Sequence, residues 1–74
     1  MSKLPSVSGS DAIRAFERIG YEVDRQRGSH VILRQSVAPH RRLVVPVHKS
    51  LAKGTLRSLI QESGLTVDAF VALL

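Results

Sequence analysis

Hydrophobic residues recur at two different periods along this chain of 74 residues, and the change of period separates helices from strands. Over residues 9–19 they follow the three-to-four-residue spacing of an amphipathic helix. Ser8 is the expected N-cap, with Asp11 three residues later as in a shortened capping box. Gly20 stands where a left-handed C-cap is typical. The spacing therefore predicts a first helix over residues 9–19, after an extended lead-in at residues 1–7.

The next part of the chain alternates between hydrophobic and polar residues with a period of two, which is typical of half-buried strands. The alternation predicts three strands and their inward side chains: residues 21–26 with Tyr21 and Val23, residues 29–34 with Val31 and Leu33, and residues 41–47 with Leu43, Val45 and Val47. Arg27-Gly28 is the expected hairpin turn. Pro46 places the third strand at a sheet edge or a strand end. The hydroxyl of Tyr21 is expected at the rim of the core.

Helical periodicity returns near residue 53, where Leu56, Leu59 and Ile60 indicate a second helix that ends at Gly64. Thr66 is the expected N-cap of a short last helix. One side of this last helix is predicted to carry Val67, Phe70, Val71 and Leu74.

Short loops favour an antiparallel meander of the three strands. The helices can then cover one face of the sheet and leave the other face open. We therefore predict an α+β fold in a single domain over residues 1–74. The order is α-β-β-β-α with a three-stranded antiparallel sheet, helices on one face and a short C-terminal helix. This is the architecture of the double-stranded-RNA-binding fold.

Charge adds a candidate partner to this picture. The net charge is +5, and eight of the 11 Lys and Arg residues lie in residues 25–61, a segment without Asp or Glu. Such a field attracts polyanions, and arginine suits bidentate contact with phosphate. A solvated basic face is the ordinary alternative. The distribution nevertheless favours a nucleic acid, here RNA, as partner.

Several classes of site and location are not expected. The chain has no cysteine, which excludes disulfides and cysteine-zinc sites. His30, His40 and His48 lack metal-ligand spacing, so neither a metal nor another cofactor is predicted. No apolar run of signal-peptide length follows Lys3, and no stretch approaches the roughly 20 apolar residues that span a bilayer. We expect a cytoplasmic protein without membrane contact.

His30 is the residue best suited to acid–base chemistry. Strand alternation points His30 and Arg34 to the face opposite the core. Histidine changes charge near neutral pH, and RNA cleavage needs a base for the 2′-hydroxyl, an acid for the 5′-oxygen and cations for the phosphorane-like transition state. Ser29 can orient a phosphate or simply finish the turn, and Arg34 is a candidate phosphate contact. An exposed histidine without a function is the simpler alternative, and the sequence places neither His40 nor His48 near His30.

The segment from Lys53 to Arg57 opens the second helix, whose N-terminus offers free backbone N–H groups and the positive end of the helix dipole. Lys49, Lys53 and Arg57 are spaced by four residues and share one side wherever the segment is helical. Lys53 and Arg57 are therefore candidates for phosphate binding. An ordinary solvated helix N-terminus is an equally weighted alternative.

Four short motifs occur in order along the chain: Gly20-Tyr21, Arg27-Gly28-Ser29-His30, Arg42-Leu43-Val44-Val45-Pro46-Val47-His48 and Lys53-Gly54-Thr55-Leu56-Arg57. In this order and spacing they resemble the HicA-type mRNA interferase toxins, the YcfA-like family, over about residues 4–66. The resemblance implies the double-stranded-RNA-binding fold, metal-independent cleavage of mRNA and neutralisation by a HicB-type antitoxin. It also implies that His30 is the catalytic histidine.

Three functions therefore stand as hypotheses. The first is a toxin of a type II toxin–antitoxin system that acts as an endoribonuclease, with His30 as general acid or base. The second is a non-catalytic RNA-binding module, which differs in that bound RNA is not shortened. The third is an interaction protein whose basic face docks an acidic protein partner.

Overall fold

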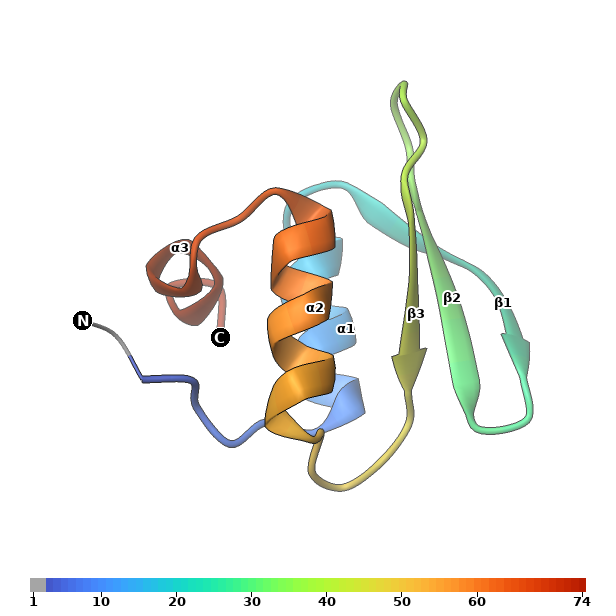
Figure 1. The fold of residues 1–74 in the computed structure, drawn as a ribbon. Coiled ribbons are helices and arrows are strands. Elements are labelled where there is room, and N and C mark those ends of the chain that lie inside the picture. The colour runs from blue at the N-terminus through green and yellow to red at the C-terminus, as the bar shows by residue number, and fades with distance from the viewer. Residues whose placement is uncertain (1–2) are drawn as a thin grey trace.

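The computed structural model describes residues 3–74, so the first two residues of the expected lead-in lie outside the described part. Its elements follow one another as α1 (Gly9–Glu17), β1 (Tyr21–Arg27), β2 (His30–Gln35), β3 (Arg42–Pro46), α2 (Lys53–Ser63) and α3 (Val67–Val71). The helices lie on one side of the three-stranded sheet, and its other face is uncovered (Figure 1). This confirms the predicted α+β fold, including the short C-terminal helix. No helix within residues 3–74 is long and apolar enough to cross a membrane.

The sheet is an antiparallel meander in the order β1-β2-β3. Gly28 and Ser29 form the turn between β1 and β2, one residue later than predicted, and Gly28 has a positive φ of 56° that favours glycine. The register of β1 against β2 shifts between Val23 and Arg25, which makes Asp24 the extra residue of a β-bulge. Pro46 is the last residue of the edge strand β3, as predicted.

The core lies between the helices and the sheet. It takes alternate residues of β2 and β3 and the apolar sides of the helices, and it includes Val31, Leu33, Leu43, Val45, Ala12, Phe16, Leu56, Leu59 and Ile60. Phe16 is its aromatic centre: its ring lies 5.8 Å from that of Tyr21 and 5.3 Å from that of Phe70. Phe70 thereby attaches α3 to the core. This agrees with the predicted inward faces of β2, β3 and α2.

Four residues expected inside are instead substantially exposed: Val23, Val47, Val71 and Leu74. Val23 pairs with the buried Leu33 and so shares the covered face, but it is 51% exposed. The reason is that both long helices pack against β3, while β1 is the strand farthest from α2 (Figure 1). Val47 lies beyond the end of β3. The last helix, α3, has only five residues and buries only Phe70 fully, so Val71 and Leu74 stay exposed.

The helix-end signals at Ser8, Thr66 and Gly64 behave as predicted. Gly20 is not the C-cap of α1, because the helix ends earlier and its C-cap is Arg18. The hydroxyl of Ser8 accepts a hydrogen bond from the Asp11 N–H at 3.0 Å, and the Thr66 hydroxyl accepts one from Ala69 at 3.1 Å. Gly64 ends α2 in the left-handed conformation, with a φ of 80°. The first helix ends at Glu17, two residues earlier than predicted, and Ile19 is already half-exposed.

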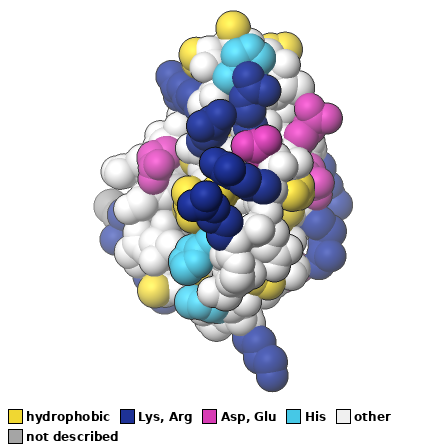
Figure 2. Space-filling view, turned by 90° about the vertical axis from the view of Figure 1, so that its right-hand side faces the viewer, with side chains coloured by type: hydrophobic (Ala, Val, Ile, Leu, Met, Phe, Trp, Pro, Cys, Tyr) yellow, Lys and Arg dark blue, Asp and Glu magenta, His cyan; other side chains and the backbone are white. Residues whose placement is uncertain are grey.

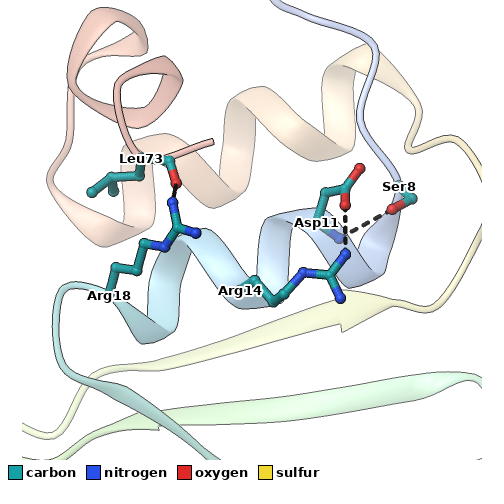
Figure 3. Close-up of polar contacts among 5 residues, drawn as sticks. All are labelled: Ser8, Asp11, Arg14, Arg18 and Leu73. Carbon is teal, nitrogen blue, oxygen red and sulfur yellow. Dashed lines mark hydrogen bonds and ion pairs between the residues drawn. The ribbon is translucent and has the colours of Figure 1, made fainter.

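Side chains on the outer side of α1 connect the first helix to its surroundings (Figure 3). Arg14 forms an ion pair with Asp11 at 2.8 Å. The hydrogen bond from Arg14 to the Asp11 carboxyl lowers the pKa of this carboxyl, and hydrogen bonding with Ser8 lowers it further. Arg18 donates a hydrogen bond to the backbone carbonyl of Leu73 and so joins α1 to the C-terminal segment.

Gly9 sets how closely α1 approaches the sheet. Its N–H donates to the carbonyl of His48 at 2.9 Å. A Cβ atom at this position would lie 2.0 Å from the carbonyl oxygen of Pro46, much closer than two such atoms can approach. Glycine is therefore required here by the backbone of β3 rather than by its own φ and ψ angles.

Candidate nucleic-acid interface

The uncovered face of the sheet is built from the residues that alternate with the core. Residues paired across neighbouring strands point to the same face, so the register defines three rows. From the β1–β2 turn upward, the rows are Arg27–His30–Pro46, Arg25–Ile32–Val44 and Glu22–Arg34–Arg42. We call these nine residues the open face.

The open face is basic with a small apolar centre. It carries four arginines against one glutamate, and all four arginines are exposed. Val44 is 50% exposed and Ile32 is partly exposed, so neither belongs to the core. In Figure 2 the Lys and Arg side chains form a column down the middle of this side of the molecule, with histidine side chains near both its upper and its lower end. Within residues 3–74 these four arginines have no ion-pair partner.

His30 lies at the end of the open face, as the first residue of β2. Its side chain is exposed, and its cross-strand neighbours are Arg27 on β1 and Pro46 on β3. None of these neighbours is acidic. The histidine is therefore accessible to a substrate and has a cation in the adjacent strand. The strand alternation had predicted this orientation, and the register agrees with it.

The other two histidines lie in different places. His48 follows two residues after Pro46, the cross-strand partner of His30, and the Ser29 carbonyl accepts a hydrogen bond from the Val47 N–H at 2.7 Å. This contact brings the segment that carries His48 to the same end of the sheet as His30. His40 belongs to the loop at the opposite end of β2, where its Nδ1 lies 3.0 Å from the Gln35 carbonyl oxygen. Only His48 thus remains as a second histidine for the His30 end.

The remaining predicted site residues fall into two groups. Ser29 lies in the turn next to His30, and Arg34 lies four residues further along the same strand face, about 13 Å away at the usual rise of a strand. Lys53 and Arg57 are exposed on the first two turns of α2, in the helical layer. The structure therefore places Arg34 with His30 on one face, and it places Lys53 and Arg57 on a separate element.

The N-terminus of α2 nevertheless lies at the same end of the molecule as the β1–β2 turn and the end of β3 (Figure 1). Its N-cap is Ala52, whose side chain accepts no hydrogen bond, and its first turn contains no acidic residue. The first N–H groups of the helix are thus without a side-chain cap. Such a terminus favours an anion through its free donors and its dipole.

Sequence reasoning missed three arginines of the open face: Arg25, Arg27 and Arg42. Arg42 alternates with Leu43 and could have been found from the pattern of β3 alone. Arg27 follows once the turn is placed at Gly28–Ser29, because it then pairs with His30. Arg25 could not be found in this way. Strict alternation from Tyr21 would put it on the core face, and the bulge at Asp24 turns it outward to pair with Ile32.

This arrangement offers one proton-transfer group and several cations to a bound phosphodiester. Histidine can remove or donate a proton, and arginine can stabilise negative charge on phosphate oxygens. Among residues 3–74, no three side chains of His, Cys, Asp or Glu are grouped so that they could hold a metal ion.

Comparison with known proteins identifies a family whose sequence model matches this chain. The sequence model of the HicA toxin of bacterial toxin–antitoxin systems matches residues 9–65, which is well over half of the chain. The match begins with α1 and ends just after α2, so it includes the whole sheet and the open face. No curated protein sequence matches the chain.

Proposed function

Because the chain belongs to the HicA toxin family of bacterial toxin–antitoxin systems, we propose that it is an endoribonuclease that cleaves mRNA without a metal ion, in the cytoplasm. One observation carries this proposal. His30 is exposed at the end of a basic sheet face, beside Arg27, where a phosphodiester can reach it.

In the proposed reaction the 2′-hydroxyl of a ribose gives its proton to His30 and attacks the adjacent phosphorus. The bond from phosphorus to the 5′-oxygen then breaks, and this leaving oxygen takes up a proton. The products carry a 2′,3′-cyclic phosphate and a free 5′-hydroxyl. Arg27 and the main-chain turn at Gly28–Ser29 adjoin the position of the reacting phosphate, and the positive charge of Arg27 stabilises the phosphorane-like transition state.

The leaving oxygen can be protonated in two ways. His30 can return the proton it has taken, or His48 can supply one from the neighbouring segment. The two differ in the pH dependence of the rate: a single histidine gives one ionisation, whereas a base and an acid together give a bell-shaped profile. We propose Ser29, Arg34, Lys53 and Arg57 as phosphate contacts that hold the strand while this happens.

The proposed protein partner is a HicB-type antitoxin. A partner that is acidic where it meets residues 25–57 would associate rapidly and would exclude RNA at the same time. We expect it to cover His30. RNA cleavage by a complex whose structure leaves His30 open to solvent would contradict this mode of inhibition.

The test of the catalytic proposal is His30→Ala, with His40→Ala as the control, since both residues are exposed histidines and His40 lies in the loop at the opposite end of β2. Loss of a proton-transfer group costs about 10²–10⁴-fold in rate. We expect that loss of RNA cleavage for His30→Ala and the parent rate for His40→Ala. The His30→Ala variant should keep the parent stability within about 0.5 kcal/mol, as surface changes usually do. The His40→Ala variant also loses the contact between Nδ1 and the Gln35 carbonyl oxygen, which should cost about 1 kcal/mol.

Three measurements on the same purified proteins separate the alternatives: the thermal midpoint, RNA affinity and the cleavage rate. A folded His30→Ala variant that cleaves at the parent rate would show that His30 is not catalytic. A parent protein that binds RNA without shortening it would instead be a non-catalytic RNA-binding module. A protein that ignores RNA and binds only an acidic protein would be an interaction module.

A further inference from the structure

The open face continues well beyond His30, and its three rows repeat every two residues along β2. Each step between rows is about 7 Å, which is comparable to the distance between successive phosphates of an extended polynucleotide strand. Every row contains at least one arginine, and none of the four is neutralised by an ion pair within residues 3–74. The face thus repeats positive charge at the spacing at which a nucleic-acid strand repeats negative charge.

We propose that the open face is a track for a single strand of RNA, with Arg25, Arg34 and Arg42 binding the phosphates that follow the one at His30. This rests on the function proposed above, and it assigns the form of the substrate and the residues that hold it. The strand would run along β2 from the Gly28–Ser29 turn toward the β2–β3 loop.

The dimensions of the face favour a single strand over a duplex. Three strands spaced by about 4.8 Å make the face only about 10 Å wide, and the rows from His30 to Arg34 extend about 13 Å. A surface of this size contacts a few nucleotides of one strand. Protein domains that bind duplex RNA contact two successive minor grooves, which requires a longer surface. The chemistry agrees, because the attacking and leaving oxygens must lie in line across the phosphorus. A flexible single strand reaches that geometry more readily than a strand held in a helix.

Acidic side chains mark one border of the track. Glu22 and Asp24 lie on β1 and share with Arg34 a shallow hollow of about 190 Å³. Their charge disfavours phosphate on this side, so the strand should pass over Arg34 and Arg42 toward β3 rather than over the upper part of β1. Ile32 and Val44, in the middle row, offer apolar contact to sugars or bases without an aromatic ring for stacking. Weak dependence on base identity beside the cut should follow.

The first test measures the salt dependence of binding to a labelled single-stranded RNA of 12 nucleotides. All proteins carry His30→Ala, so that cleavage does not interfere. The double change Arg34→Gln and Arg42→Gln should lower the slope of log affinity against log salt by about 1.4, since each lost phosphate contact on a single strand removes about 0.7. Arg25→Gln should lower it by about half as much. The control Lys3→Gln with Arg14→Gln removes the same charge from the helical side and should leave the slope of the His30→Ala reference unchanged.

Equal slopes for the open-face and control variants would overturn the track. Tighter binding of a duplex than of a single strand of the same sequence would also overturn it. If the open-face variants bind RNA like the reference but lose affinity for an acidic antitoxin, the face is a protein-docking surface and the proposal is wrong.

The second test uses cleavage by the wild-type protein and separates the track from the catalytic proposal. The rows that carry Arg25, Arg34 and Arg42 lie on one side of His30, so the length of the RNA should matter on that side of the cut. Removing nucleotides there should lower the cleavage rate at each of two or three positions. A cleavage rate that does not change when these nucleotides are removed would overturn the track and leave the catalytic proposal intact. If the salt slopes change as predicted but the wild-type protein cleaves no RNA, the track is supported and the catalytic proposal is wrong.

Discussion

The two faces of the sheet are made from neighbouring residues of the same strands, yet their side chains have opposite surroundings. In β2, Val31 and Leu33 are buried beneath the helices, while His30, Ile32 and Arg34 point outward between them. Within the described chain the covered face contains no buried charged residue and, apart from the hydroxyl of Tyr21, no buried polar side-chain group, while the open face carries four arginines. Strand alternation thus lets one short sheet stabilise the fold with one set of residues and contact a ligand with the other.

This separation means that the open face can be altered without removing core contacts. None of its arginines packs in the core, and the side chain of His30 makes no hydrogen bond within residues 3–74. Substitutions on the covered face should instead change stability first, and activity only through the folded fraction. The following predictions test how complete this division is.

The largest effect on stability is expected from Leu33→Ala, with its chain neighbour Ile32→Ala as control. Leu33 is fully buried, and such truncations cost about 2–5 kcal/mol because they remove apolar contacts and leave a cavity. Ile32 lies on the open face and is partly exposed, so its truncation should cost less than about 1 kcal/mol. Chemical denaturation measures both. Equal losses would mean that the open face is part of the core.

The sequence predicts which residues lie on each face only where the strands are regular. The alternation in β2 and β3 correctly separates Leu33, Leu43 and Val45 from His30 and Arg34, because both strands are regular. In β1 it fails. The bulge at Asp24 reverses the face of Arg25, and the distance of β1 from α2 leaves Val23 exposed. Neither feature is encoded in a period of two, since each depends on how other elements pack.

The close contact at Gly9 is a second feature that the sequence did not predict, and it gives the next largest effect. Gly9→Ala would force a Cβ atom against the backbone oxygen of Pro46. The backbone must move to accept it, and overpacking of this kind costs about 1–3 kcal/mol. The control is Gly54→Ala, in the first turn of α2, where no atom lies within 4 Å of the added group.

In the control, alanine's better helix propensity should make the change neutral or stabilising by up to about 1 kcal/mol. Thermal unfolding of the two variants compares two glycines at helix starts that differ only in their surroundings. A Gly9→Ala protein as stable as the parent would show that α1 can shift away from β3 at little cost.

Lys53 and Arg57 test whether ligand contact is confined to the sheet. If both residues bind phosphate, Lys53→Ala with Arg57→Ala should lower the salt slope of single-stranded RNA binding by about 1.4. The fold should be kept, since both side chains are exposed and lie away from the buried Leu56 and Leu59. An unchanged slope would restrict the phosphate contacts to the open face and leave α2 with a purely structural role.

The smallest effect is expected at Tyr21, the one residue of β1 that is fully buried. Its hydroxyl was expected at the rim of the core. It is instead enclosed, and it has no hydrogen-bond partner among residues 3–74. A buried hydroxyl without a partner costs free energy because it has lost its bonds to water. Tyr21→Phe keeps the ring that packs at 5.8 Å from Phe16 and removes only this hydroxyl. At neutral pH the variant should therefore match the parent or exceed its stability, by no more than about 1 kcal/mol.

Measurements of stability at alkaline pH distinguish a buried hydroxyl from one that is hydrated and has no effect on stability. Burial raises the pKa of Tyr21 above its ordinary value of 10.0, and Glu62 adds to this, while Arg41 opposes it. A raised pKa means that ionisation of the phenol takes nothing from the stability of the fold below pH 10, and that stability is lost as the pH rises from there through the folded-state pKa. The unfolded chain then binds fewer protons than the folded one, so the parent should lose stability relative to Tyr21→Phe above pH 10. The measurement is the difference between their unfolding free energies from pH 7 to 11, which cancels the lysines that titrate in both. A constant difference would mean that the hydroxyl reaches water, and that the covered face is open at the start of β1.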